Sequence, residues 1–354
     1  MSQELEPLFR KMFRLGIDTF MVSDLHVIRW LTGFSGSNAR VLLNRHHSAL
    51  FTDFRYGEQV KHEVDSMESV IIQNSFVDTF VEGGYLQGKK LGIQAEQVTV
   101  YDAGQLGEKL KGIDIVPVHG FFDEFRELKN ELEIAWMKQA AAISEKVFEE
   151  ILPLISTEVT EAEIAAEISY RHKRYGAEKD SFDPIVASGI RSALPHARPA
   201  KKTFSPGNLI VIDMGCVCNG YASDQTRTVA FGRIPDEARK IYEITREAQQ
   251  LGIEAARPGM PAKELDTLVR GYIDKSGYGE FFGHGLGHGV GVEVHEKPRL
   301  GKTSEDYLLS GSVFTIEPGI YLPGKFGVRI EDTVVMGKSG VAPFQRFTKE
   351  LIAL

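Results

Sequence analysis

Cysteine and basic charge are both scarce in this sequence. It has two cysteines in 354 residues, Cys216 and Cys218, and the single residue between them makes a mutual disulfide geometrically poor. Lys and Arg number 41 against 49 Asp and Glu, which gives a formal net charge of −8. Because phosphate binding requires a basic field, nucleic acid is not expected as a partner. The low cysteine content is typical of a reducing compartment, so we expect a cytoplasmic protein.

Long apolar runs are absent as well. The sequence contains no stretch of about 18 uncharged apolar residues, so no transmembrane helix and no membrane partner are predicted. Met1–Arg14 alternates charged and apolar residues and does not have the apolar centre of a secretory signal. Hydrophobic residues make up 42% and charged residues 25%, as in ordinary globular proteins. A chain of this length predicts about two domains.

Two segments with different patterns follow one another along the chain. Residues 1–122 alternate short apolar runs with helical stretches, which predicts a small α/β domain. Residues 123–354 combine amphipathic helices with strand-like runs, and one of these helices begins with the capping-box pair Thr160 and Glu163. The second domain is therefore predicted to be α+β, with helices packed on an antiparallel sheet.

Two acidic residues lie beside core positions in the first hairpin of this second domain. The apolar run 209–212 ends in Asp213, and the chain returns through Asp224 after the turn dipeptide Asn219-Gly220. A hairpin centred between residues 218 and 219 places Asp213 opposite Asp224, with side chains about 5 Å apart. Two facing carboxylates repel each other, so we expect a cation between them.

The same pattern recurs near the C-terminus. Val313–Glu317 leads into a Pro-Gly turn, and the chain returns through Val328–Glu331. The midpoint of this connection is Gly324, so the hairpin sets Glu317 across from Glu331. Asp and Glu are depleted in strands, and four of them at core-adjacent positions indicate a site and not a solvated surface.

A glycine-rich segment lies between the two hairpins. Residues 283–291 carry His284 and His288 among glycines, and His295 follows shortly after. Glycine lets backbone pack closely around a site, which favours a functional role for His288. The glycine spacing does not match a phosphate-binding loop, and the chain contains neither a His-Glu-x-x-His zinc helix nor a Gly-x-Ser-x-Gly nucleophile motif.

Charge balance then predicts two metal ions. Four ionised carboxylates are neutralised by two divalent cations, whereas a single cation leaves two negative charges in a cleft of low dielectric. Oxygen-rich ligation with one imidazole suits Mn²⁺ as the first choice, with Co²⁺ or Zn²⁺ as alternatives. Two metal ions that share one water generate a nucleophile at neutral pH. The predicted chemistry is metal-assisted hydrolysis.

These residues, in this order and setting, resemble the metal ligands of the pita-bread metallopeptidases: Asp213, Asp224, His288, Glu317 and Glu331. That family includes methionine aminopeptidase, aminopeptidase P, prolidase and the metal-free creatinase. Four local strings carry the resemblance: Asp224–Thr228, His288–Pro298, Ile316–Gly319 and Val328–Asp332.

The first domain resembles the creatinase-type N-terminal domain of Xaa-Pro peptidases. The strings Leu31–Ser37 and Phe51–Tyr56 carry this likeness, and methionine aminopeptidases lack such a domain. The resemblance thus implies a creatinase-like α/β domain over residues 1–122 and a pita-bread catalytic domain over residues 123–354. It also implies a homodimer.

The resemblance implies a role for each metal ligand. Asp213 would hold one ion, His288 and Glu317 would hold the other, and Asp224 and Glu331 would bridge both. Glu317 would also act as the general acid and base for the attacking water.

Four further residues receive roles in the same way. His295 would stabilise the tetrahedral oxyanion. His196 would contact the substrate near the scissile bond, and His284 would line the pocket. Arg329 would support the carboxylates and border the substrate site.

The implied activity is hydrolysis of the Xaa-Pro bond at the N-terminus of proline-containing peptides. Several microbial prolidases, which cut only dipeptides, have Arg directly after the first histidine of the glycine-rich segment, where this chain has Gly285. This difference favours aminopeptidase P, which acts on longer peptides. Prolidase remains the alternative because Arg191 or a loop of the first domain could supply a cation for the dipeptide carboxylate. A creatinase-like hydrolase and a peptide-binding pseudoenzyme are less favoured, since all five ligands are intact.

Overall fold

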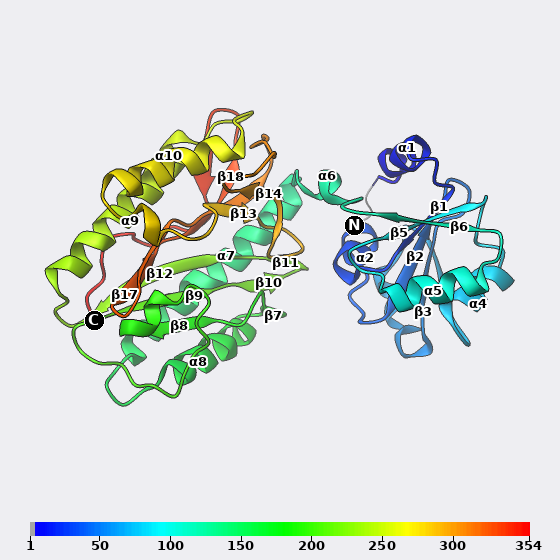
Figure 1. Cartoon of the computed structure of the whole chain (residues 1–354). Helices are drawn as coiled ribbons and strands as arrows, with labels where there is room; N and C mark the ends of the chain where they lie inside the picture. Colours follow the sequence, from blue (N-terminus) through cyan, green and yellow to red (C-terminus); the bar gives the residue numbers. More distant parts are fainter. Residues whose placement is uncertain (1–3) are drawn as a thin grey trace. The chain divides into compact units, whose positions relative to one another are not determined.

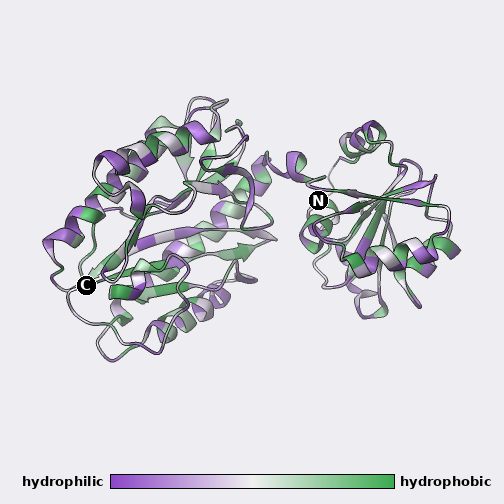
Figure 2. Cartoon of the chain, in the orientation of Figure 1, coloured by the Kyte–Doolittle hydropathy of each residue, from purple (hydrophilic) through white to green (hydrophobic). Residues whose placement is uncertain are grey.

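The computed structural model describes residues 4–354, so the first three residues of the predicted 1–122 domain lie outside the described part. The chain divides into two compact units, Met1–Asp123 and Glu124–Leu354 (Figure 1). Figure 2 shows apolar residues along the central strands of each unit, while the helices alternate apolar and polar residues. Within residues 4–354, no helix combines the length and the apolar character that a bilayer crossing requires.

The first unit is built on a six-stranded mixed sheet, as far as residues 4–123 are concerned. The strand order is β4-β3-β2-β1-β5-β6, in which β1 pairs antiparallel with β2 and parallel with β5. The strands are β1 Thr19–Val22, β2 Ala39–Leu43, β3 Ala49–Thr52, β4 Glu68–Ile71, β5 Lys90–Gln94 and β6 Asp114–Val118. The helices are α1 Glu6–Arg14, α2 Leu25–Thr32, α3 Gln59–Glu63, α4 Phe76–Glu82 and α5 Val100–Lys109, and α6 Asp123–Arg126 follows where the units meet in sequence.

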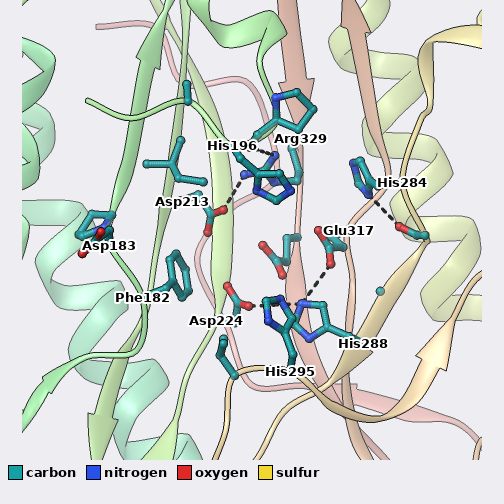
Figure 3. A pocket seen from close by; sticks show the side chains of 18 of the residues that line it. Phe182, Asp183, His196, Asp213, Asp224, His284, His288, His295, Glu317 and Arg329 are labelled. Atoms are coloured by element: carbon teal, nitrogen blue, oxygen red, sulfur yellow. Dashed lines mark hydrogen bonds and ion pairs between the residues drawn. The ribbon is translucent and has the colours of Figure 1, made fainter. Parts of the chain in front are cut away.

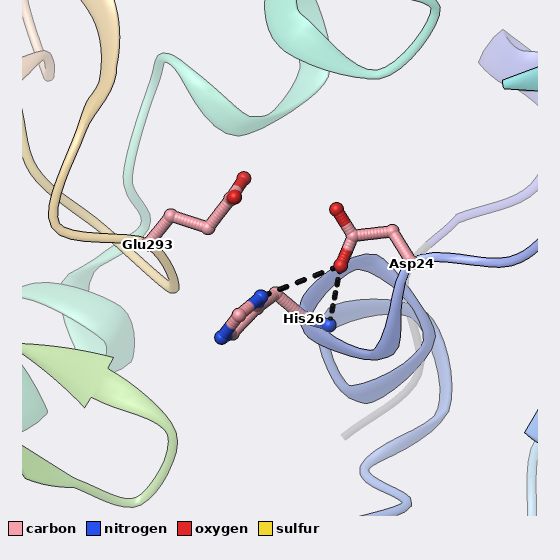
Figure 4. Close-up of side chains that lie close together, drawn as sticks. All are labelled: Asp24, His26 and Glu293. Carbon is pink, nitrogen blue, oxygen red and sulfur yellow. Dashed lines mark hydrogen bonds and ion pairs between the residues drawn. The ribbon is translucent and has the colours of Figure 1, made fainter. Parts of the chain in front are cut away.

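Local side chains define where the helices of this unit begin. Asp24 caps α2, because its carboxylate accepts the backbone N–H groups of His26 and Val27. The His26 imidazole Nδ1 lies 3.4 Å from the same Asp24 oxygen (Figure 4). The side chains of Ser75 and Thr99 cap α4 and α5 in the same way.

The second unit has four main helices and several antiparallel sheets among its described residues. The helices are α7 Glu131–Ile151, α8 Glu161–Arg174, α9 Asp236–Ala255 and α10 Ala262–Lys275. The strands are β7 Lys179–Asp180, β8 Ile185–Ser188, β9 Asn208–Met214, β10 Cys216–Cys218, β11 Tyr221–Ala222, β12 Gln225–Phe231, β13 Gly287–Gly289, β14 Glu296–Leu300, β15 Val313–Ile316, β16 Gly319–Leu322, β17 Phe326–Arg329, β18 Asp332–Met336 and β19 Val341–Pro343. The predicted α+β class is confirmed, and so is the Thr160 capping box at the start of α8.

Two helix pairs cover different parts of these strands. The apolar faces of α7 and α8 pack on the sheet β12-β9-β8, for example Ile168 in one cluster with Ile212. The helices α9 and α10 pack on the sheet β14-β13-β15-β18-β19, for example Val269 in one cluster with Phe314. Burial of these apolar faces fixes the strand ends that carry the acidic residues.

The first hairpin has a register different from the one predicted. Asp213 pairs with Thr226, not with Asp224, because the turn is centred between residues 219 and 220. Asn219 has φ 50° and Gly220 has φ 84°, as both central residues of a tight hairpin turn require. The predicted centre was one residue too early, which shifts the pairing by two. Since strand side chains repeat every two residues, Asp213 and Asp224 still lie on one face as diagonal neighbours.

The second hairpin follows the predicted register. Ile316 pairs with Asp332 and Gly319 pairs with Arg329, so the residues between these pairs bring Glu317 across from Glu331. The strands are interrupted at residues 317–318 and 330–331, and the turn at the tip of the hairpin includes Gly324, which has φ 75°. Both acidic pairs are therefore carried by hairpins of the same unit.

Gly220→Ala tests the turn that sets the first hairpin. A side chain at positive φ costs about 1 kcal/mol, so the free energy of unfolding of the full-length protein in urea should fall by that amount. Gly271→Ala is the matched control, because Gly271 lies inside α10 with open space at its Cβ position and should gain up to about 1 kcal/mol. If both variants lost the same free energy of unfolding, the positive φ of Gly220 would not be what stabilises the hairpin.

Candidate metal centre

The five predicted metal ligands converge in one cavity of the second unit. The cavity encloses about 460 Å³, and Figure 3 shows acidic and histidine side chains pointing into it from several strands. Its lining includes all five predicted ligands: Asp213 in β9, Asp224 between β11 and β12, His288 in β13, Glu317 after β15 and Glu331 before β18. The two hairpins and the glycine-rich segment thus meet at one point.

Ligand atoms approach one another closely in this cavity. The His288 Nε2 atom lies 3.3 Å from Glu317 Oε1 and 3.6 Å from Asp224 Oδ2. Asp224, His288 and Glu331 each offer one atom within 4.8 Å of the other two. Asp224 and Glu331 are 5% and 2% exposed, so their charges are removed from bulk water. Such a group of buried oxygen and nitrogen donors suits a divalent cation.

Burial and mutual repulsion change the pKa values of the acidic residues in the metal-free cavity. Burial, reinforced by the Asp213 charge, raises the pKa of Asp224 well above its usual range. Burial and the Asp224 charge do the same to the pKa of Glu331. For Glu317, burial alone acts to raise the pKa, but the hydrogen bond and charge of His288 lower it to about 2. The metal-free cavity therefore favours the protonated forms of Asp224 and Glu331, and bound cations would favour their ionised forms.

One oxygen of Asp213 is left without a protein partner. Within residues 4–354, Asp213 Oδ1 is buried and accepts no hydrogen bond, while Oδ2 accepts one from Arg329 Nη2 at 2.5 Å. A buried oxygen without a partner costs about 1–3 kcal/mol unless a ligand satisfies it. The Asp213 carboxylate therefore fits a metal ion on one oxygen and Arg329 on the other.

Arg329 connects several members of the site. Its Nε donates to Thr226 Oγ1 at 3.0 Å, and that hydroxyl donates to Glu331 Oε2 at 2.6 Å. Its Nη1 donates to the Tyr321 hydroxyl at 2.8 Å and to the Pro195 carbonyl at 3.1 Å. With Asp213 on Nη2, most of its N–H groups are committed to protein acceptors, so Arg329 fixes two of the carboxylates from behind.

Tyr321 is a site residue that the sequence analysis missed. Its hydroxyl lies between Arg329 and His284 Nε2, which is 2.9 Å away, and burial raises its pKa to about 12. A Cβ at Gly319 or Gly327 would lie 2.5–2.7 Å from Tyr321 atoms, so both glycines make room for this side chain. The period-two spacing 317, 319, 321 along the strand was the signal available in the sequence.

The predicted histidines also line the cavity. The rings of His288 and His295 have centroids 4.3 Å apart, and burial together with the His288 charge lowers the pKa of His295 to about 4. His295 is therefore neutral at pH 7. Burial also lowers the pKa of His284. His196 is exposed toward the cavity on the loop before β9.

Helix α10 holds the segment that carries the first two histidines. The Arg270 guanidinium donates to the carbonyls of Phe282 and His284, at 2.6 and 2.7 Å. Its partner on the same helix, the buried Asp266 carboxylate, accepts the Leu286 N–H at 3.0 Å. The Leu286 carbonyl in turn accepts the N–H of Glu317. The histidine segment and the Glu317 strand are thus fixed to each other.

A Ser–His–Asp arrangement elsewhere in this unit is structural. Ser144 Oγ lies 3.2 Å from His172 Nε2, and His172 Nδ1 lies 2.7 Å from Asp180 Oδ1. Ser144 and His172 are completely buried, so no substrate reaches the hydroxyl. The carboxylate cavity therefore remains the candidate functional site.

Two family models match this chain. Residues 135–338 match the Metallopeptidase family M24, and residues 5–128 match the Creatinase/Prolidase N-terminal domain. The protein belongs to the M24 metallopeptidase family. It is a metal-dependent peptidase with a creatinase-type N-terminal domain and a pita-bread catalytic domain, as the sequence resemblance implied.

The full-length relatives of this M24 metallopeptidase include proteins named Xaa-Pro dipeptidase and a protein named X-Pro aminopeptidase. A Xaa-Pro dipeptidase of Pyrococcus horikoshii is 37% identical, with 99% of both chains covered. The structure of a Xaa-Pro dipeptidase from Bacillus anthracis matches with a TM-score of 0.96 at 37% identity, covering 99% of each chain. The structure of an X-Pro aminopeptidase from Thermotoga maritima matches with a TM-score of 0.90 at 36% identity, covering 98% of this chain and all of the other.

Metal binding to this M24 metallopeptidase should release protons. Burial alone acts to lower the pKa of His288, but its hydrogen bond to Glu317 and the nearby negative charges raise it to about 9 in the metal-free protein. A metal ion needs the neutral imidazole, so the proton competes with the ion below pH 9. The affinity for Mn²⁺ should therefore rise steadily from pH 6 to pH 9.

Calorimetric titration of the chelator-treated protein measures this linkage. In buffers with different ionisation enthalpies, the apparent binding enthalpy should show net proton release to the buffer at pH 7. If the Mn²⁺ affinity did not change between pH 6 and pH 9, His288 and the acidic residues of the cavity would be excluded as the metal ligands.

Proposed function

We propose that this protein is a Xaa-Pro exopeptidase, which hydrolyses the bond between an N-terminal residue and a following proline. The observation that carries the proposal is the convergence of four acids and His288 in one cavity of an M24 chain. Full-length relatives named Xaa-Pro dipeptidase and X-Pro aminopeptidase support the substrate class. We assign the peptidase reaction to a catalytic domain of residues 123–354, preceded by the 1–122 domain.

We propose two divalent ions per subunit, with Mn²⁺ as the first choice. Asp213 would hold one ion, His288 and Glu317 the other, and Asp224 and Glu331 both. When bound, the ions provide an acidified water and polarise the scissile carbonyl. The partnerless oxygen of Asp213 and the raised pKa values of Asp224 and Glu331 support this assignment.

Residues of the chain itself transfer the protons and stabilise the negative charge that develops on the scissile carbonyl. The Glu317 carboxylate accepts a proton from the attacking water and returns it to the proline nitrogen as the C–N bond breaks. Neutral His295 donates an N–H hydrogen bond to the oxyanion that develops on the carbonyl. Tyr321 and Arg329 keep Asp213 in place during these steps.

The cavity also has an apolar wall that suits a proline ring. Phe182, Pro184 and Ile185 line the same cavity as the metal ligands, and Figure 3 shows Phe182 beside Asp213 and Asp224. The tertiary amide nitrogen of an Xaa-Pro bond has no N–H to donate, and the proline ring is compact and apolar. Both features favour an apolar surface over a polar one. His196 and His284 border the same space and complete the substrate site in this proposal.

A second candidate is a Xaa-Pro dipeptidase restricted to dipeptides. Gly285 favoured longer substrates in the sequence, but a Cβ there would lie 2.6 Å from the Leu300 carbonyl oxygen, so packing alone requires glycine. Arg191, one of the proposed cation sources, is bound to Glu161 Oε2 at 2.9 Å. Arg198 lines the cavity instead, and this observation favours the dipeptidase.

We also propose a cytoplasmic homodimer. Cys216 and Cys218 are buried free thiols, which fits a reducing compartment. The dimer rests on the family resemblance.

Asp224→Asn tests the bridging role. The amide removes one negative charge and one metal-binding oxygen, so we expect loss of at least one bound ion per chain and a fall in kcat of more than about a hundredfold. Circular dichroism should be unchanged, and elemental analysis measures the metal content. A fully metallated, active variant would refute the assignment.

Parallel incubation with Ala-Pro and Ala-Pro-Ala tests the proposed activity. The Mn²⁺-loaded protein should release alanine from proline-containing peptides, and a chelator should abolish the release. Cleavage of the dipeptide alone identifies a dipeptidase, and cleavage of the tripeptide identifies an aminopeptidase. Failure to cleave either peptide after metal loading rejects the Xaa-Pro assignment.

A further inference from the structure

The imidazole of His295 has no hydrogen bond of its own. Its ring lines the cavity and lies against the ring of His288, with centroids 4.3 Å apart (Figure 3). Within residues 4–354, neither ring nitrogen of His295 forms a hydrogen bond or an ion pair. The direction in which these nitrogens point is therefore set by the backbone that carries the ring and by its packing on His288.

The backbone around His295 is held by the next residue, Glu296. Residues 290–295 form the loop that joins β13 to β14, and Glu296 is the first residue of β14. Glu296 Oε1 accepts the N–H of Glu293 in this loop at 3.1 Å. A Cβ at Gly291 would lie 2.3 Å from Glu296 Oε2, so the carboxylate fills the space beside that glycine. The Glu296 side chain thus contacts the 290–295 loop at two points before His295.

Two cations from a distant segment bind the carboxylates on either side of His295. Lys129 Nζ donates to Glu296 Oε2 at 3.0 Å, and the two side chains are 2% and 3% exposed. Arg126 Nη1 donates to Glu293 Oε2 at 2.6 Å and lies 3.7 Å from Glu296 Oε1. Both hydrogen bonds join residues that are 167 positions apart in the sequence. The 290–295 loop is therefore fixed by buried charge from outside its own sheet.

The segment that supplies these cations is itself anchored. The N–H of Lys129 donates to the Gly311 carbonyl at 3.0 Å, and the next residue, Asn130, caps α7 with its side chain. Arg126 and Lys129 follow shortly after the boundary between the two units, which lies at residues 123 and 124. The position of the Lys129 ammonium thus depends on α7 and on the segment before β15, and not on the 290–295 loop.

We propose that Lys129 and Glu296 are positioning residues, which orient the His295 imidazole toward the oxyanion that develops on the scissile carbonyl. This inference rests on the role of His295 in the function proposed above. A buried carboxylate is stable as an ion only beside its cation, because each charge offsets the desolvation of the other. Without this pair the Glu296 end of the 290–295 loop is released. A hydrogen-bond donor displaced by about 1 Å no longer matches the transition state.

A neutral pair of similar shape tests this role. The double variant Lys129→Met/Glu296→Gln removes both charges at once and keeps an oxygen for the Glu293 N–H, so it leaves no unpaired buried charge and should fold. With the better substrate of Ala-Pro and Ala-Pro-Ala, kcat should fall at least about tenfold, while KM and the number of bound Mn²⁺ ions stay unchanged. A loss of metal in proportion to the loss of kcat would overturn the proposal.

The neighbouring residue of the same strand offers a matched control pair. Lys297 Nζ lies 3.1 Å from Asp306 Oδ1, and neither residue lines the cavity. The double variant Lys297→Met/Asp306→Asn removes one ion pair from β14 and keeps an oxygen for the Arg299 N–H that Asp306 accepts. It should leave kcat within about twofold of wild type, because a partly exposed pair contributes little. If both double variants lowered kcat equally, the specific role of Lys129 and Glu296 would be refuted.

A cycle with His295→Ala shows whether the ion pair acts through that histidine. His295→Ala alone should lower kcat about a hundredfold, as the loss of an oxyanion donor does. In this background, Lys129→Met/Glu296→Gln should lower kcat by less than about a further twofold, since two changes on one path are not additive. A further tenfold loss on top of His295→Ala would show that the pair acts elsewhere, and the proposal would fail.

Amide hydrogen exchange separates this proposal from the proposed activity. In the full-length protein without substrate, the amides of residues 290–296 should exchange at least about tenfold faster in Lys129→Met/Glu296→Gln than in wild type, while those of β9 exchange at the same rate. Faster exchange in a protein that cleaves neither peptide rejects the Xaa-Pro reaction and retains the hold of the pair on the loop. Unchanged exchange rejects the positioning role whether or not the enzyme is active.

Discussion

Mutual repulsion among buried carboxylates is the constraint on which the rest of this structure depends. Asp213, Asp224, Glu317 and Glu331 share one cavity, and burial together with the neighbouring negative charges raises the pKa values of Asp224 and Glu331. Arg329 offsets part of this charge, and divalent cations must offset the rest. The same repulsion that disfavours the metal-free cavity gives it a strong preference for metal ions.

The fold brings these charges together with two antiparallel hairpins and secures them with long-range hydrogen bonds. Arg329 reaches Asp213 across 116 residues of sequence, and α10 holds the histidine segment through Asp266 and Arg270. Each side chain is fixed by an element whose apolar face is buried, so the ligands are positioned before a metal ion binds. This preorganisation is what a hydrolytic centre requires.

Packing explains why residue 285 is glycine, the residue that in the sequence favoured aminopeptidase P over prolidase. Gly285 lies against the Leu300 carbonyl oxygen and leaves no room for a side chain. On the loop before β9, Arg191 donates to the Glu161 carboxylate and to the carbonyl oxygen of Arg198, and Glu161 also accepts the Ala200 N–H.

The sequence by itself determined the α+β class, the five residues that meet in the cavity and the register of the second hairpin, because these follow from side-chain alternation and residue chemistry along single strands. Only the tertiary structure decided the register of the first hairpin, where the positive φ of both Asn219 and Gly220 moves the turn centre by one residue. It also decided that Tyr321 joins Arg329 to His284 and that Arg191 is already bound to Glu161. Such contacts join distant segments, and no local pattern in the chain encodes them.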